Sequence, residues 1–283
     1  MLAQARSLLG AGRARLLTPS LENVLRRQAG HWPGAATFVL SFDVETRADC
    51  AALPALLDRL DDLALPATFA CIGAWAEAYP REHEAIVRSG HEVIDHTDRH
   101  PSHDELSPAR RFDELTDEEL DHEIVRARTK LQRLGASVLG FRSPHFGVMH
   151  TERVYAILRR EGIAYSSSTV ATRTPSGAPL RIGGVWEFPV LACPQHPTEA
   201  LDPWHCTTAP GARHADAASL VGLYRRALDL LVTHRAYGSV YWDPSAAALP
   251  GYAEVLRLLA EARDRVRLTT YGALLSELDE AAG

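Results

Sequence analysis

The sequence predicts an α/β barrel preceded by a short helical extension, and three observations lead to this fold class. Apolar runs of strand length alternate with helical patterns, which is typical of parallel strands joined by helical crossovers. We expect about seven or eight such strands, a number that suits a barrel better than an open sheet. Polar residues follow several of these strands, and α/β barrels carry their active sites at the carboxyl ends of their strands.

Composition narrows the class of protein. The chain has 283 residues and a hydrophobic content of 46%, enough for one large domain. A net charge of -6 offers no basic surface to a phosphate backbone, so we expect no nucleic-acid partner. The cysteines form no C-x-x-C pair and indicate no disulfide framework. We find neither a membrane-spanning run nor a signal-peptide core, so the expected location is cytoplasmic.

The predicted division is a helical extension at residues 1–33 and a barrel domain at residues 34–283. Apolar residues recur at helical spacing in the extension: Leu8, Leu9, Leu16, Leu17, Leu21, Val24 and Leu25. Trp32-Pro33-Gly34 ends that pattern, since proline and glycine interrupt helices. Whether the extension packs on its own chain or mediates self-association is left open by the sequence.

In the first part of the barrel domain, strands are expected at residues 37–42, 67–72 and 92–94, and helices at 51–63 and 74–89. Leucines at three-and-four spacing predict the 51–63 helix, in which Pro54 falls within the tolerant first turn. Gly90 ends the following helix, because glycine favours the turn after a helical C-terminus.

In the second part, Thr116 and Glu119 form a capping box that opens a helix, and Gly135 closes it. Further strands are expected at 138–141, 163–166, 185–190, 237–242 and 266–268, and further helices at 151–161, 215–234, 251–263 and from Tyr271 onward. Residues 191–214 are rich in proline, histidine and threonine and are expected to form a long loop.

Two carboxylates lie at the end of the first strand. Asp43 and Glu45 point to the same side of an extended segment, with Val44 on the other side. One can ligate a metal while the other accepts a proton from water. The alternative is structural, because either acid could cap the helix that follows.

Two histidines follow the third strand. His96 and His100 lie four residues apart and would share a face if the segment were helical. Together with the acidic pair they supply three metal ligands and a base, the inventory of a hydrolytic metal site. Alone, the pair is a weak signal, because surface histidines are common in this chain.

A third polar segment, Phe141-Arg142-Ser143-Pro144-His145, follows the fourth strand. Arg142 could orient a carboxylate through paired N–H bonds, and Pro144 would restrict the turn. In isolation, a surface arginine before a proline turn explains this segment better.

Taken together, these motifs resemble the polysaccharide deacetylase family, the NodB-homology domain of carbohydrate esterase family 4. The resemblance runs from about Thr37 to Leu275. It is carried by Asp43-Val44-Glu45, by Gly90-His91-Glu92 followed by His96-Thr97-x-x-His100, by Arg142-x-Pro144, and by Glu187-Phe188-Pro189-Val190. The histidine motif is the most specific of these.

The resemblance implies a distorted (β/α)7 barrel and a divalent metal, usually zinc. Carried over to this chain, the metal ligands are Glu45, His96 and His100, the general base is Asp43, and Arg142 is its partner. The two acids could exchange roles.

Two positions depart from the family pattern. Asp243 stands where the family has a histidine that protonates the leaving amine, and Tyr165-Ser166-Ser167-Ser168 lacks an acid found in many members. An ordinary aspartate has a pKa of about 3.9, so Asp243 would need a rise of about 3 units to act as an acid at neutral pH. Asp43 itself, His145, His196 or His205 could serve instead.

The function that follows is removal of an N-acetyl or related N-acyl group from an amino sugar or a small cytoplasmic intermediate. Pro144, Trp204 and Trp242 are candidate substrate contacts. Trp204 could stack on a sugar ring, and a buried structural role explains this tryptophan at least as well. Hydrolysis of a non-carbohydrate linear or cyclic amide is one alternative. A binding protein that has lost hydrolytic activity is the other, motivated by Asp243.

Overall fold

The structure is a computed structural model that describes residues 18–208 and 216–282. The strands are β1 (Thr37–Val44), β2 (Thr68–Cys71), β3 (Glu92–Asp95), β4 (Gly140–Phe141), β5 (Tyr165–Ser166), β6 (Leu180–Ile182), β7 (Val185–Glu187), β8 (Tyr237–Trp242) and β9 (Arg267–Thr269). The helices are α2 (Leu21–Gln28), α3 (Arg47–Asp62), α4 (Gly73–Ala78), α5 (Pro80–Arg88), α6 (Asp117–Arg133), α7 (Val154–Arg160), α8 (Ala217–His234), α9 (Pro250–Glu261) and α10 (Tyr271–Ala282).

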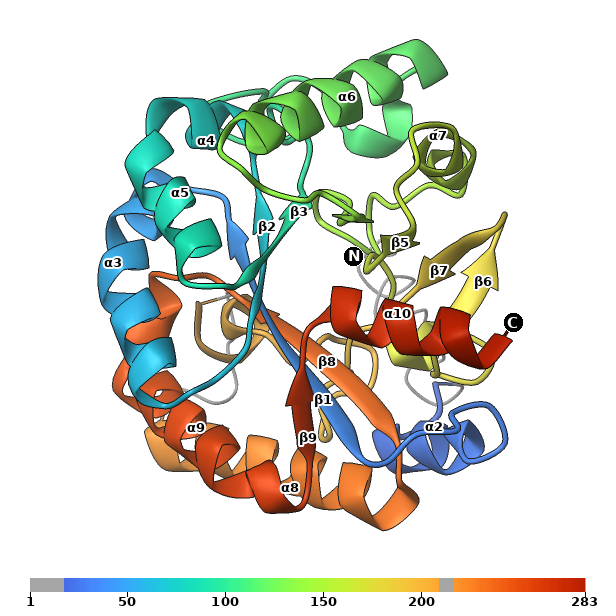
Figure 1. Ribbon diagram of the computed structural model, residues 1–283. Helices are drawn as coiled ribbons and strands as arrows, with labels where there is room; N and C mark the ends of the chain where they lie inside the picture. The colour runs from blue at the N-terminus through green and yellow to red at the C-terminus, as the bar shows by residue number, and fades with distance from the viewer. Residues whose placement is uncertain (1–17, 209–215, 283) are drawn as a thin grey trace, which may run out of the picture.

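The strands form one curled sheet, in the order β6-β7-β5-β4-β3-β2-β1-β8, with β9 also beside β1. The pairs are parallel except for the β6–β7 hairpin. Helices α3 to α9 surround the outside of this sheet, and α10 crosses its opening (Figure 1). The predicted α/β fold with a barrel-like sheet is confirmed.

The chain segment that follows β7 is hydrogen-bonded to β8, the strand at the other end of the sheet. The Leu191 N–H donates to the Ser239 carbonyl of β8 at 2.7 Å. The Ser239 hydroxyl donates to the Pro189 carbonyl at 3.1 Å. The segment after β7 therefore runs beside β8 without a regular ladder, which makes the barrel a distorted one.

Three local predictions need correction. Helix α3 begins at Arg47 and not at residue 51, because Thr46 and Asp49 form a capping box there; Pro54 therefore lies inside the helix and not in its first turn. The helix expected at 74–89 is two helices, divided at Tyr79 because Pro80 starts a new helical turn. Strand β6 was not expected; it pairs with β7 across Gly183 and Gly184, whose positive φ angles suit a tight hairpin.

Helix α2, within the predicted extension, packs against the barrel of its own chain. Leu21, Val24 and Leu25 are buried. The Gln28 side chain donates to the carbonyls of Gly177 and Tyr237 and accepts from the Tyr237 N–H at 2.8 Å. The leucines expected at 8, 9, 16 and 17 lie outside the described residues.

Within the described residues, none of the helices combines the length and apolar character that a membrane crossing requires.

Candidate active site

The candidate chemical residues meet at the carboxyl ends of the parallel strands. Asp43 is the second-last residue of β1, and Glu45 follows that strand directly. His96 follows β3, Arg142 follows β4 and Asp243 follows β8, in each case as the next residue. A cleft of about 700 Å³ opens at this end of the sheet, with Asp43, Glu45, His100 and Asp243 in its lining.

The two histidines converge through a loop rather than a helix, which corrects the helical expectation. Residues 96–100 form no helical turn, and both Thr97 and His100 have positive φ angles, 66° and 51°. A left-handed backbone is costly for residues other than glycine, by about 1–3 kcal/mol each, and tends to gather at functional sites. In this strained conformation, the loop places both imidazoles beside the carboxylate of Glu45.

Glu45, His96 and His100 offer three ligand atoms that all lie within 4.8 Å of one another. Glu45 Oε1 lies 2.9 Å from His96 Nε2 and 3.3 Å from His100 Nε2. Both ring nitrogens of His100 are buried, and neither has a hydrogen-bond partner in the part of the chain that the structure describes. Two imidazoles and one carboxylate suit a divalent metal, and the orphaned nitrogens of His100 fit such a ligand.

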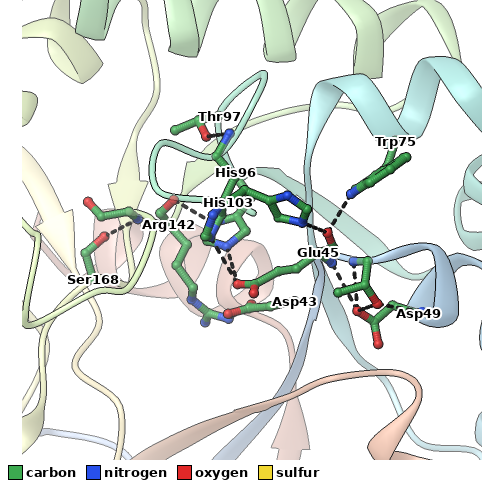
Figure 2. Close-up of polar contacts among 12 residues, drawn as sticks. Asp43, Glu45, Asp49, Trp75, His96, Thr97, His103, Arg142 and Ser168 are labelled. Atoms are coloured by element: carbon green, nitrogen blue, oxygen red, sulfur yellow. Dashed lines mark hydrogen bonds and ion pairs between the residues drawn. The ribbon is translucent and has the colours of Figure 1, made fainter. Parts of the chain in front are cut away.

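Neighbouring groups fix the orientation of these ligands (Figure 2). The carbonyl of Glu45 accepts from Trp75 Nε1 at 2.5 Å and lies 2.8 Å from His103 Nε2. His96 Nδ1 lies 2.8 Å from the Arg142 carbonyl, so its Nε2 is directed at Glu45. Such second contacts set the tautomer and ring orientation of metal-binding histidines. Burial would raise the pKa of Glu45, but His100 and His96 hold it well below its usual value.

Asp43 and Arg142 form a buried ion pair beside these ligands. Arg142 is fully buried and also donates to the Ser41 hydroxyl at 2.9 Å, the Ser167 carbonyl at 3.0 Å and the Tyr271 hydroxyl at 3.1 Å. Burial raises the pKa of Asp43, and the adjacent guanidinium opposes that rise. The pair therefore holds a carboxyl group that is fixed in position and lines the cleft.

Removing the guanidinium should destabilise the fold strongly. Arg142→Met leaves Asp43 buried without its partner, and breaking one side of such a pair costs about 3–5 kcal/mol. We expect that loss in the free energy of unfolding measured by urea titration. The control is Arg257→Met, because Arg257 is exposed and pairs with Glu254 only at 4.0 Å. Surface changes of that kind stay within about 0.5 kcal/mol, and equal losses in both variants would contradict the assignment.

Asp243 lies across the cleft, partly exposed to it. Burial raises the pKa of Asp243 to about 9, and the nearby charges of Glu45, Asp49 and Asp43 add to the rise. The sequence-based objection to Asp243 as an acid was its ordinary pKa. In this environment the carboxyl group is protonated at neutral pH and has a proton to donate.

Of the four remaining predicted residues, two line the cleft and two are buried. His145 and Trp204 line the cleft; Trp204 is 57% exposed, and the His145 ring centroid lies 4.9 Å from that of His100. Pro144 is buried in the turn after β4. Trp242 is fully buried, donates to the Tyr224 hydroxyl at 2.6 Å, and packs against Phe42. The prediction that Trp242 contacts substrate needs correction, because a core side chain offers no surface to a ligand.

Sequence reasoning missed Asp49 and Asp202. One oxygen of Asp49 accepts from the backbone and hydroxyl of Ser245, while the other accepts from Thr46, so Asp49 joins the segment after β8 to the segment after β1. Asp202 lines the cleft, and burial raises its pKa to about 6. The capping pattern Thr46-x-x-Asp49 was a readable signal for the first; Asp202 lies in an irregular loop that carries none.

Comparison with known proteins places these features in a family. Residues 33–166 match the family model described as polysaccharide deacetylase. A chitooligosaccharide deacetylase from Bradyrhizobium sp. is 35% identical over 91 residues, which are 32% of this chain and 41% of that protein. One from Sinorhizobium fredii is 32% identical over 114 residues, 40% of this chain and 48% of that protein. The chain thus matches less than half the length of either relative.

Solved structures share the fold over most of the chain. A protein from Mycobacterium smegmatis that is classed with the polysaccharide deacetylases aligns with a TM-score of 0.72 at 20% identity, covering 89% of this chain and 93% of that one. A similarly classed protein from Pseudomonas aeruginosa aligns with a TM-score of 0.68 at 15% identity, covering 91% of this chain and 93% of that one. At these identities the likeness concerns the fold alone.

Proposed function

We propose that this protein is a metal-dependent hydrolase that removes an N-acetyl or related N-acyl group from an amino sugar. The match of residues 33–166 to the polysaccharide deacetylase family model and the fold shared with solved structures support this proposal. The observation that carries the metal-dependent mechanism is the convergence of Glu45, His96 and His100 beside Asp43. The family relation carries the reaction class.

A divalent ion such as zinc, held by these three residues, would supply a Lewis acid for the acyl carbonyl and a water of lowered pKa. Asp43 would take the proton from the attacking water. Arg142 keeps Asp43 fixed and ionised through the buried pair, so the base does not need to reorganise during the reaction.

Asp243 would protonate the leaving nitrogen. Its raised pKa, to about 9, gives it the required proton at neutral pH, and it faces the same cleft as Asp43. His145 and His205 also line the cleft and are the rival donors. The third candidate is Asp43 itself, which could pass the proton that it takes from water to the leaving nitrogen.

The charge of the cleft favours a neutral substrate and a cationic product. Arg173 is the one arginine or lysine among the described residues that line the cleft, and acidic side chains outnumber it. Apart from the protonated Asp243, these acids are Asp43, Glu45, Asp49, Asp104, Glu105, Glu199 and Asp202. This field would repel a phosphorylated donor and attract the ammonium group formed when an amide is cleaved. We therefore favour a neutral amino sugar, with Trp204 as the stacking surface, over a nucleotide-linked precursor. A non-carbohydrate amide of similar charge is the second candidate, and a cytoplasmic location stays a prediction.

Metal content is the first test. We expect His100→Ala to hold one divalent ion fewer per chain than wild type, because the site loses a ligand and metal affinity with it. Acetate release from a chitooligosaccharide should fall to background in the same variant. The control is His122→Ala, an exposed histidine on α6, which should keep both properties. Equal metal content in His100→Ala and wild type would contradict the proposed ligand set.

A further inference from the structure

A second group of potential metal ligands lies in the loop that follows β7. Cys193, His196 and His205 bring a thiol and two imidazoles together, and their ligand atoms all lie within 4.8 Å of one another. Cys193 Sγ is 3.6 Å from His196 Nδ1. The rings of His196 and His205 meet edge to face, with centroids 5.6 Å apart. These residues are separate in sequence from Glu45, His96 and His100.

We propose that Cys193, His196 and His205 form a second metal site, suited to a zinc-like divalent ion. A thiolate and neutral imidazoles are the ligands that such ions prefer. In a tetrahedral site, with metal–sulfur and metal–nitrogen bonds of about 2.3 and 2.0 Å, a sulfur and a nitrogen lie about 3.5 Å apart. The observed separation of Cys193 Sγ and His196 Nδ1, 3.6 Å, is close to this value.

The backbone of the loop positions the donors before any ion is bound. The Cys193 N–H donates to the Glu199 carbonyl at 2.8 Å, and the His196 N–H donates to the Cys193 carbonyl at 3.1 Å. The Asp202 carboxylate accepts from the His205 N–H at 2.7 Å, which fixes the start of the turn at Trp204–Thr208. A binding loop ordered in this way loses little conformational entropy when an ion binds.

The chemistry around the thiol is compatible with coordination. Burial raises the pKa of the Cys193 thiol, while the backbone N–H groups of Gln195 and His196 favour the thiolate. A bound cation would complete that stabilisation, since a coordinating thiol is deprotonated. Glu199 Oε2 lies 3.9 Å from His205 Nδ1, so its carboxylate or a water would supply the fourth ligand.

An ion bound at this second site would stabilise one wall of the cleft. Trp204, Glu199 and His205 all line the cleft, and His205 is also one of the three ligands. An ion at this position would tie the turn that carries Trp204 to the segment beside β8. The site would hold the stacking surface in place, whereas Glu45, His96 and His100 would hold the ion that takes part in hydrolysis.

Cobalt substitution distinguishes the two sites because only the second has a sulfur ligand. Metal-free protein is loaded with Co²⁺ under reducing conditions and passed through a desalting column. We expect a thiolate-to-cobalt charge-transfer absorption band in the near ultraviolet, lost in Cys193→Ser and retained in His100→Ala. The control is Cys50→Ser, which removes a buried cysteine of α3 that takes no part in the cluster, and the band should persist.

His205→Gln provides the independent variant, since it keeps all the cysteines and changes a partly exposed side chain. It should also lose the band, or shift it strongly, and should hold one ion fewer than wild type. Absence of the band in folded wild-type protein would overturn the proposal. Persistence of an unchanged band in both Cys193→Ser and His205→Gln would overturn it as well. Neither result depends on the deacetylase assignment, because the assay requires no catalysis.

Discussion

Replacing Asp43 with asparagine should lower kcat for acetate release by about 10²–10⁴-fold, the usual contribution of a positioned general base. Metal content should stay at the wild-type level. The amide cannot accept the proton of the attacking water, but its oxygen still accepts a hydrogen bond from Arg142, so the shape of the site is kept. The measurement is steady-state hydrolysis of an N-acetylated oligosaccharide together with elemental analysis of the same preparation.

The control for this variant is Asp104→Asn, an exposed acid on the same cleft. It lowers the negative charge of the cleft by the same amount but carries no proposed chemical role. We expect kcat within about twofold of wild type, since a distant exposed charge is strongly screened. If Asp43→Asn lost its metal together with its activity, Asp43 and Glu45 would have exchanged roles as ligand and base.

The placement of the site could be predicted from sequence because it follows from a property of parallel sheets. Asp43, His96, Arg142 and Asp243 each lie at the end of an apolar run, and the strands of a parallel sheet end on the same side. No three-dimensional information was needed to bring them together. Alternation of strand and helix patterns likewise sufficed for the fold, since right-handed crossovers leave few other arrangements.

Details that depend on backbone conformation could not be predicted in the same way. The histidine spacing suggested a helical turn, but positive φ angles at Thr97 and His100 make a loop, and side-chain spacing carries no signal for them. The raised pKa of Asp243 depends on its burial and, to a smaller extent, on carboxylates from distant segments. Trp242 could not be distinguished from a cleft residue, because its burial depends on Tyr224 and Tyr252 from α8 and α9.

Replacing Asp243 with asparagine should separate amide hydrolysis from ester hydrolysis. An amide nitrogen must be protonated to leave, so loss of the acid should lower kcat by about 10²–10⁴-fold. A p-nitrophenolate group leaves without a proton, so hydrolysis of p-nitrophenyl acetate should change little. Asp243→His, which supplies another acid at the same position, should recover part of the amide activity. Equal losses of kcat on both substrates would instead indicate damage to the site. No loss on either substrate would indicate that His145 or His205 is the general acid.

The same substitution should make the metal-free protein more stable at neutral pH. The pKa of Asp243 is about 9 in the folded chain and 3.8 as its reference value, so the folded state holds a proton that the unfolded state releases. Stability from this group is therefore greatest at low pH and declines as the pH rises from about 4 to about 9. Asparagine cannot ionise, so Asp243→Asn should flatten this decline in urea titrations. A variant that is less active on amides yet more stable would show that the cleft retains a costly carboxyl group because its chemistry requires one.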